Sequence, residues 1–165
     1  MIQKIVSGGQ TGADRAALDF AIENGIPYGG WSPKGRIAED GTIPERYILK
    51  ECTRKGYPAR TEQNVVDSDA TVIISIKSGL SKASQLTANY ADKHGKPWIH
   101  IHHGTEEPGQ LLMEFLQQHD VKILNVAGPR ASGEPEVTNF VRELLANVLS
   151  RRSAGSSSCW QMACQ

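Results

Sequence analysis

The sequence predicts an α/β domain built on a mostly parallel sheet. Three observations indicate this fold class. A short β-branched run at 2–6 breaks at two glycines and leads into alanines and a leucine at helical spacing. Further strand-like runs at 70–76 and 121–127 each lead through a loop into a helical pattern. The run at 70–76 is nearly continuous in β-branched residues, which is typical of a central strand buried on both faces.

Length and composition limit the classes of function. The chain has 165 residues, which predicts one domain over 1–150 followed by a tail at 151–165 of linker composition. Its 18 Lys and Arg balance 18 Asp and Glu, so no overall field favours nucleic acid or an anionic membrane. We expect a cytoplasmic protein, because the sequence shows no signal-peptide or membrane-spanning pattern and its three cysteines lack the spacing of metal ligands.

The glycine-rich loop after the first strand is the leading candidate for a ligand site. A helix over about 12–24 begins there, and the first amides of a helix, with its dipole, attract anions. Polar residues crowd this turn and add hydrogen-bonding capacity. The alternative is that the glycines serve only for turning. The candidate ligand-binding residues of this loop are Gly8, Gly9, Gln10, Thr11, Gly12, Asp14 and Arg15.

The segment from 26 to 68 is predicted to combine a long ordered loop with short helices. An extended stretch at 26–28 precedes an ordered loop over 29–44 with several glycines and prolines. In this loop Lys34, Gly35 and Arg36 are candidates for binding a phosphate or carboxylate, or they form a solvated surface turn.

Two short helices are predicted in the second half of this segment. Pro44 suits the first turn of a short helix through about residue 50 or 52. Thr61 is the predicted N-cap of a second short helix. Its neighbours Arg60 and Asn64 face the ligand or serve in local capping.

The strand at 70–76 continues into a hydroxyl-rich loop, in which Ser78 and Ser84 are further ligand candidates. A helix follows over 86–91 and ends at His94–Gly95. Ligands of open parallel sheets bind beyond the carboxyl ends of the strands. If the first strand and this strand are neighbours, their two loops face each other across one crevice.

The last part of the domain alternates strand and helix. In the strand at 96–103, His100 and His102 share one face, which fits a metal site or a half-exposed strand end, and we predict no bound metal. An amphipathic helix is expected over 108–118. The strand at 121–127 leads into Gly128, Pro129 and Arg130, at a ligand position of this architecture, although a surface salt bridge could also use the arginine. A helix begins near Glu134.

Several of these segments together resemble a known family. The matching stretches are 7–19, 29–36, 38–41, 60–65, 67–71 and 124–130. They are similar to the proteins described as molybdenum carriers, a circularly permuted, YpsA-like branch of the SLOG proteins, which are related to the LOG enzymes. The resemblance implies a three-layer, doubly wound, Rossmann-like fold. It also implies a phosphorylated small-molecule ligand, either molybdopterin (the molybdenum cofactor) or a nucleotide, and a homodimer or homotetramer. Lys82–Ala83–Ser84 departs from the Gly-Gly-Thr usual in the family.

The resemblance does not decide whether this protein only binds its ligand or also catalyses a reaction. A LOG-like nucleotide N-glycosidase needs a carboxylate beside the sugar, but Thr87 stands at the place of the glutamate of those enzymes. Nothing in the spacing marks Asp14, Glu39 or Asp40 as a replacement, so no catalytic residue is assigned. We therefore favour a carrier that binds a phosphorylated heterocycle. The alternatives are an N-glycosidase and a nucleotide-sensing module with a protein partner.

Overall fold

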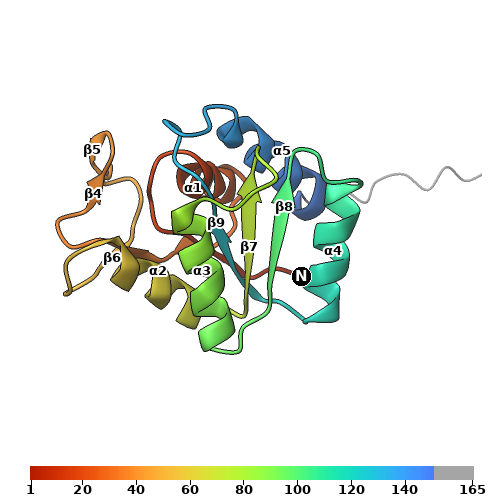
Figure 1. Ribbon diagram of the computed structural model, residues 1–165, viewed down its shortest axis with the longest axis horizontal. Coiled ribbons are helices and arrows are strands. Elements are labelled where there is room, and N and C mark those ends of the chain that lie inside the picture. The colour runs from red at the N-terminus through yellow and green to blue at the C-terminus, as the bar shows by residue number, and fades with distance from the viewer. Residues whose placement is uncertain (151–165) are drawn as a thin grey trace, which may run out of the picture.

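Five parallel strands form the central sheet of the computed structural model, which describes residues 1–150 (Figure 1). The predicted tail at 151–165 lies outside the described residues. In spatial order the strands are β2 (Tyr28–Gly29), β1 (Lys4–Val6), β9 (Ile123–Ala127), β7 (Ala70–Ser75) and β8 (Trp98–His102).

Helices cover both faces of this sheet. One face carries α2 and α3, and the other carries α1, α4 and α5, so the chain forms three layers (Figure 1). The predicted α/β, doubly wound, Rossmann-like fold is thereby confirmed. The helices are α1 (Ala13–Glu23), α2 (Tyr57–Val66), α3 (Lys82–Lys93), α4 (Pro108–Gln118) and α5 (Val137–Leu149). No helix within residues 1–150 has both the length and the apolar character of a membrane span.

The alternation of side chains along the strands decides which layer each residue joins. In β7 all six residues are buried, as the β-branched run predicts. Its Val72 and Ile74 belong to the large apolar core with Ile101 of β8, Leu112 of α4 and Val141 of α5. Side chains of the opposite parity in β7 point to the α2 and α3 side. They include Thr71, whose hydroxyl oxygen accepts a hydrogen bond from the Asn125 side chain of β9.

The last strand of the chain occupies the middle of the sheet. β9 pairs with β1 on one side and with β7 on the other. The first strand and the strand at 70–76 are therefore not neighbours, so the condition under which their two loops would face each other directly is not met. Their carboxyl ends still point to the same edge, because all five strands are parallel.

The segment from 30 to 52 contains more regular structure than its glycines and prolines indicate. β3 (Trp31–Ser32) pairs with β6 (Lys50–Glu51), and β4 (Ile37–Ala38) forms a hairpin with β5 (Gly41–Thr42). The helix predicted from Pro44 does not form, and the chain makes a turn there instead. The Arg36 guanidinium donates to the carbonyls of Ile43, Pro44 and Tyr47 and so holds this stretch as a turn, in which the Tyr47 amide donates to the Pro44 carbonyl at 3.1 Å.

Two helices begin earlier than predicted. α2 begins at Tyr57 after Gly56, which has a φ of +95°, and Pro58 lies in its first turn. Thr61 is therefore inside the helix rather than its N-cap, and its hydroxyl donates to the Tyr57 carbonyl. α3 begins at Lys82 because the Ser81 hydroxyl accepts a hydrogen bond from the Ser84 amide at 3.1 Å.

Candidate functional site

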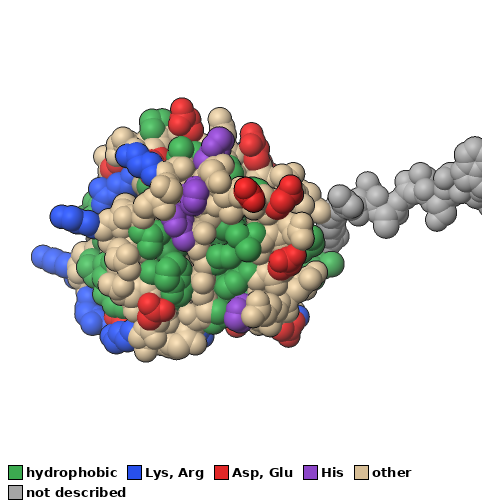
Figure 2. All heavy atoms as spheres, turned by 45° about the vertical axis from the view of Figure 1, so that its right-hand side comes forward, with side chains coloured by type: hydrophobic (Ala, Val, Ile, Leu, Met, Phe, Trp, Pro, Cys, Tyr) green, Lys and Arg blue, Asp and Glu red, His purple; other side chains and the backbone are tan. Residues whose placement is uncertain are grey.

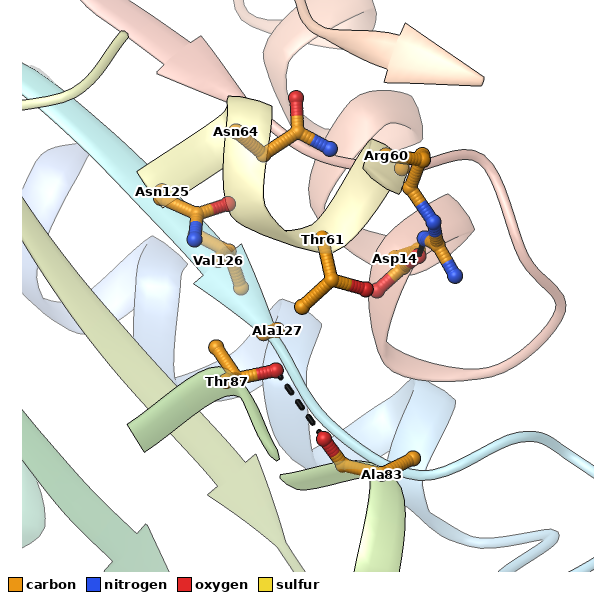
Figure 3. Close-up of a pocket in the computed structure, with 10 residues that line it drawn as sticks. Asp14, Arg60, Thr61, Asn64, Ala83, Thr87, Asn125, Val126 and Ala127 are labelled. Carbon is orange, nitrogen blue, oxygen red and sulfur yellow. Dashed lines mark hydrogen bonds and ion pairs between the residues drawn. The ribbon is translucent and has the colours of Figure 1, made fainter. Parts of the chain in front are cut away.

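A small polar cavity lies at the carboxyl ends of β1 and β9, between the beginning of α1 and the helices α2 and α3 (Figure 3). Its volume is about 50 Å³, enough for a few water molecules or one tetrahedral oxyanion. The edge of the sheet at which it lies is where open parallel sheets bind ligands. Its walls are formed by Gly8, Asp14, Arg60, Thr61, Asn64, Ala83, Thr87, Asn125, Val126 and Ala127.

A buried ion pair joins two walls of the cavity. Arg60 Nη1 of α2 donates to Asp14 Oδ2 of α1 at 2.7 Å, and the two side chains are 13% and 7% exposed. Burial raises the pKa of Asp14, and the charge of Arg60 offsets part of this rise. Among the described residues, Arg60 Nε is buried and has no hydrogen-bond partner. The guanidinium therefore keeps donor capacity that the ion pair does not use.

Gly8 makes room for this arginine. A Cβ atom at position 8 would lie 1.6 Å from Arg60 Nη1, so any side chain there would displace the guanidinium. Gly8 thus serves the site through Arg60.

Neutral polar groups complete the cavity wall. Asn125 of β9 donates from Nδ2 to Thr71 Oγ1 at 3.1 Å, which orients its amide beside the cavity (Figure 3). Thr87 of α3 donates to the Ala83 carbonyl at 3.2 Å, so its oxygen can still accept a hydrogen bond. Asn64 bonds both the amide and the carbonyl of Trp31, at 2.8 and 3.2 Å, and so holds β3 in place beside α2.

The glycine loop bonds mainly to the protein itself. The Gln10 amide donates to Asp14 Oδ2 at 3.2 Å, and the Thr11 amide donates to the side-chain oxygen of Gln10 at 3.0 Å. The Ala13 amide donates to the Pro129 carbonyl at 3.2 Å. These three amides at the beginning of α1 are therefore engaged, and the cavity presents Arg60 as its principal cationic group.

Two further glycines allow segments of the chain to approach each other closely. Gly12 has a φ of +80°, and a Cβ there would lie 2.5 Å from the Pro129 carbonyl oxygen. A Cβ at Gly128 would lie 2.2 Å from the Ile74 carbonyl oxygen. The loops after β1 and β9 are thus held in direct contact. Gly9 also has a positive φ, of +77°.

The remaining predicted residues are distributed over three places. Thr11 and Arg15 face the β4–β5 hairpin. Lys34, Gly35 and Arg36 are not brought to the cavity: Lys34 is exposed, the Gly35 amide donates to Glu51, and Arg36 bonds backbone carbonyls. Ser78 is exposed, whereas Ser84 is buried in the first turn of α3.

Sequence analysis did not single out Tyr57 or Asn125. The guanidinium carbons of Arg130 and Arg60 lie 4.8 and 5.8 Å from the centre of the Tyr57 ring, so this ring links the two arginines. Asn125 interrupts an apolar strand, and a buried amide in such a run is the signal that could have indicated it. Tyr57 offers no comparable signal, because its role depends on two distant arginines.

The histidines of β8 form a separate feature. Figure 2 shows histidine side chains grouped on one face of the molecule. The rings of His100 and His102 lie 5.7 Å apart, and His100 Nε2 is 2.7 Å from Ser75 Oγ. Burial lowers the pKa of His100. Among residues 1–150, no group of three or more His, Cys, Asp or Glu side chains is arranged to hold a metal ion.

The fold and the cavity together define a class of protein: a doubly wound α/β domain with a polar pocket at the carboxyl edge of its parallel sheet. The chain belongs to the circularly permutated YpsA SLOG family, whose model matches residues 5–149. The predicted family resemblance is thereby confirmed.

Among solved structures, the chain is similar to a protein of Syntrophus aciditrophicus SB named a putative molybdenum carrier protein. The two are 48% identical, the match covers 90% of this chain and 95% of the other, and the TM-score is 0.87. The comparison with curated proteins found no match.

Proposed function

We propose that this protein binds a phosphorylated small molecule and places its anionic group in the cavity beside Arg60. The observation that carries the proposal is the largely buried Arg60 guanidinium, which lines the cavity and is bonded to Asp14 through Nη1. A guanidinium has five N–H donors, so an anion in the cavity can accept hydrogen bonds from donors that the ion pair does not use. Arginine also suits phosphate because its planar donors match the phosphate oxygens.

The molybdenum cofactor is the ligand that we propose first. The name of the similar Syntrophus protein supports this choice. The organic part of the cofactor, molybdopterin, is a phosphorylated pterin, and the cavity residues fit its phosphate rather than its metal. Arg60 supplies a cation, and Thr87 and Asn125 supply neutral hydrogen-bonding groups. A volume of about 50 Å³ takes one anionic group, so the heterocycle would lie outside this cavity.

A nucleotide N-glycosidase is the second candidate, and Asp14 is the observation that favours it. Asp14 is the one carboxylate among the described wall residues, and its raised pKa would suit a general acid. The same carboxylate already forms an ion pair with Arg60, and no second carboxylate lines the described wall. We therefore prefer binding without catalysis.

The test is to purify the protein from a host that makes molybdenum cofactor and to identify bound small molecules by mass spectrometry. We expect a phosphorylated pterin or nucleotide in the wild type and in Arg142→Met, which loses an exposed arginine paired with Glu23. We expect none in Arg60→Met or in Arg60→Lys, which keeps the charge. Wild-type protein that is empty, or an Arg60→Lys variant that is folded and fully loaded, would contradict the proposal.

Two further measurements use the same preparation. Incubation with nucleoside monophosphates tests the second candidate, because release of free base that is lost in Asp14→Asn would identify a hydrolase. Light scattering tests the predicted homodimer or homotetramer.

A further inference from the structure

The β4–β5 hairpin places two carboxylates on the loops that surround the beginning of α1. The hairpin projects from the body of the molecule (Figure 1). The Thr11 hydroxyl donates to Glu39 Oε1, and the Ser132 amide donates to the same oxygen at 3.2 Å. The Ser132 hydroxyl donates to Glu39 Oε2. Donors from the loops after β1 and β9 thus converge on one carboxylate.

An ion pair between Arg15 and Asp40 also holds the hairpin to the beginning of α1. Arg15 donates to the two oxygens of Asp40 at 2.5 and 2.8 Å, in the forked geometry that arginine also offers to phosphate. The donors around Glu39 lower its pKa, with hydrogen bonds from Ser132 and Thr11 as the main causes and the Arg130 charge as a smaller one. The charge and donors at this place therefore stabilise a negative group.

The side chain of Gln10 lies beneath the hairpin and is only 5% exposed. Its carbonyl oxygen accepts hydrogen bonds from the Thr11 and Glu39 amides, at 3.0 and 2.9 Å. Its Nε2 atom is buried and, within residues 1–150, has no partner. A buried donor at the base of the contact indicates that the hairpin leaves part of the local hydrogen-bonding capacity unused.

The tip of the β4–β5 hairpin is exposed, whereas Ala38 of β4 is buried in a small apolar cluster with Leu18 and Tyr47. The strands of the hairpin have two residues each, and Glu39 and Asp40 are exposed to solvent. Exposed ion pairs contribute little because water screens them and ordering the side chains costs entropy. A phosphate group carries more charge than a carboxylate and has more acceptor oxygens, so it can compete for the same donors.

We propose that Thr11, Ser132 and Arg15 form a second anion subsite, which Glu39 and Asp40 fill in the ligand-free protein and from which a phosphate group displaces them. This subsite is separate from the Arg60 cavity.

The test is a titration with inorganic phosphate followed by backbone amide NMR on isotope-labelled protein. Glu39→Gln removes the competing charge, and we expect it to tighten phosphate binding about two- to five-fold at the Thr11 and Ser132 amides. Glu45→Gln is the matched control, since it removes the same charge from an exposed residue beyond the hairpin. Adding Thr11→Val to Glu39→Gln should cancel the gain. Phosphate should also speed amide hydrogen exchange at 37–42.

The proposal is overturned if Glu39→Gln binds phosphate no more tightly than Glu45→Gln, or if the Thr11 and Ser132 amides do not respond. The titration reports the Arg60 cavity independently through the Ala83 and Thr87 amides. Failure of the subsite and failure of the proposed function therefore give different spectra.

Discussion

Removing the cation of the buried ion pair should destabilise the protein strongly. Arg60→Met keeps most of the side-chain volume but leaves Asp14, whose side chain is 7% exposed, without its charged partner. Breaking a buried pair by removing one partner typically costs about 3–5 kcal/mol. Arg142→Met breaks a pair whose side chains are 37% and 53% exposed, so we expect a loss of at most about 1 kcal/mol.

Urea unfolding of both variants and the wild type measures this difference, and the pH dependence identifies its cause. Burial raises the folded-state pKa of Asp14 above its unfolded value. The associated stability is therefore present below the unfolded pKa and is lost as pH rises through the folded pKa. Without Arg60 the raised pKa rises further, so the loss in Arg60→Met should be larger near pH 8 than near pH 5. A loss equal to that of Arg142→Met, or one independent of pH, would refute this reasoning.

Three further predictions concern backbone approach, a buried amide and a histidine. Gly12→Ala combines a positive φ with a clash and should lower the free energy of unfolding in urea by about 2–4 kcal/mol. Gly25→Ala, where no atom lies within 4 Å, should lower it by about 1 kcal/mol, and equal losses in the two variants would contradict the packing argument. Asn64→Ala leaves the Trp31 amide and carbonyl unbonded and should cost about 1–3 kcal/mol by the same measurement, so an unchanged stability would be inconsistent with this role. The His100 ring should titrate by NMR below the pKa of an exposed histidine, with stability lost as pH falls through that lower value, and a midpoint at or above the exposed value would disprove it.

The regular elements could be predicted from the sequence because their patterns are local. The apolar run of β7 and the helical spacing in α1, α4 and α5 each reflect burial on one or two faces. The region around Pro44 could not be predicted in this way. Proline there indicated a helix, whereas Arg36, only a few residues earlier in the chain, bonds the carbonyls of this stretch and holds it as a turn. A side chain that binds backbone leaves no periodic signal.

The candidate site likewise has some residues that the sequence could indicate and others that only the structure reveals. Arg60 and Asp14 could be singled out as charged residues next to turns, and the structure brings them together. The partners of the glycine loop could not be foreseen, because Thr11 and Arg15 face a hairpin that lies more than twenty residues further along the chain. The contribution of Asn125 likewise depended on knowing that β9 lies beside β1. Sequence patterns indicate which residues are polar near strand ends, but pairing across the sheet decides which of them meet.

The central position of β9 has a consequence for how the molecule can assemble. Until residues 123–127 are available, β1 with β2 and β7 with β8 are two separate parallel pairs that share no ladder. Contacts between segments so distant in sequence form slowly, because closing long loops costs entropy before the contacts form. A nascent chain that ends after α4 would thus expose unpaired edges of β1 and β7. It would also lack the β9 residues that line the cavity beside Arg60 and Asp14. Folding and the creation of the pocket should therefore occur as one late event.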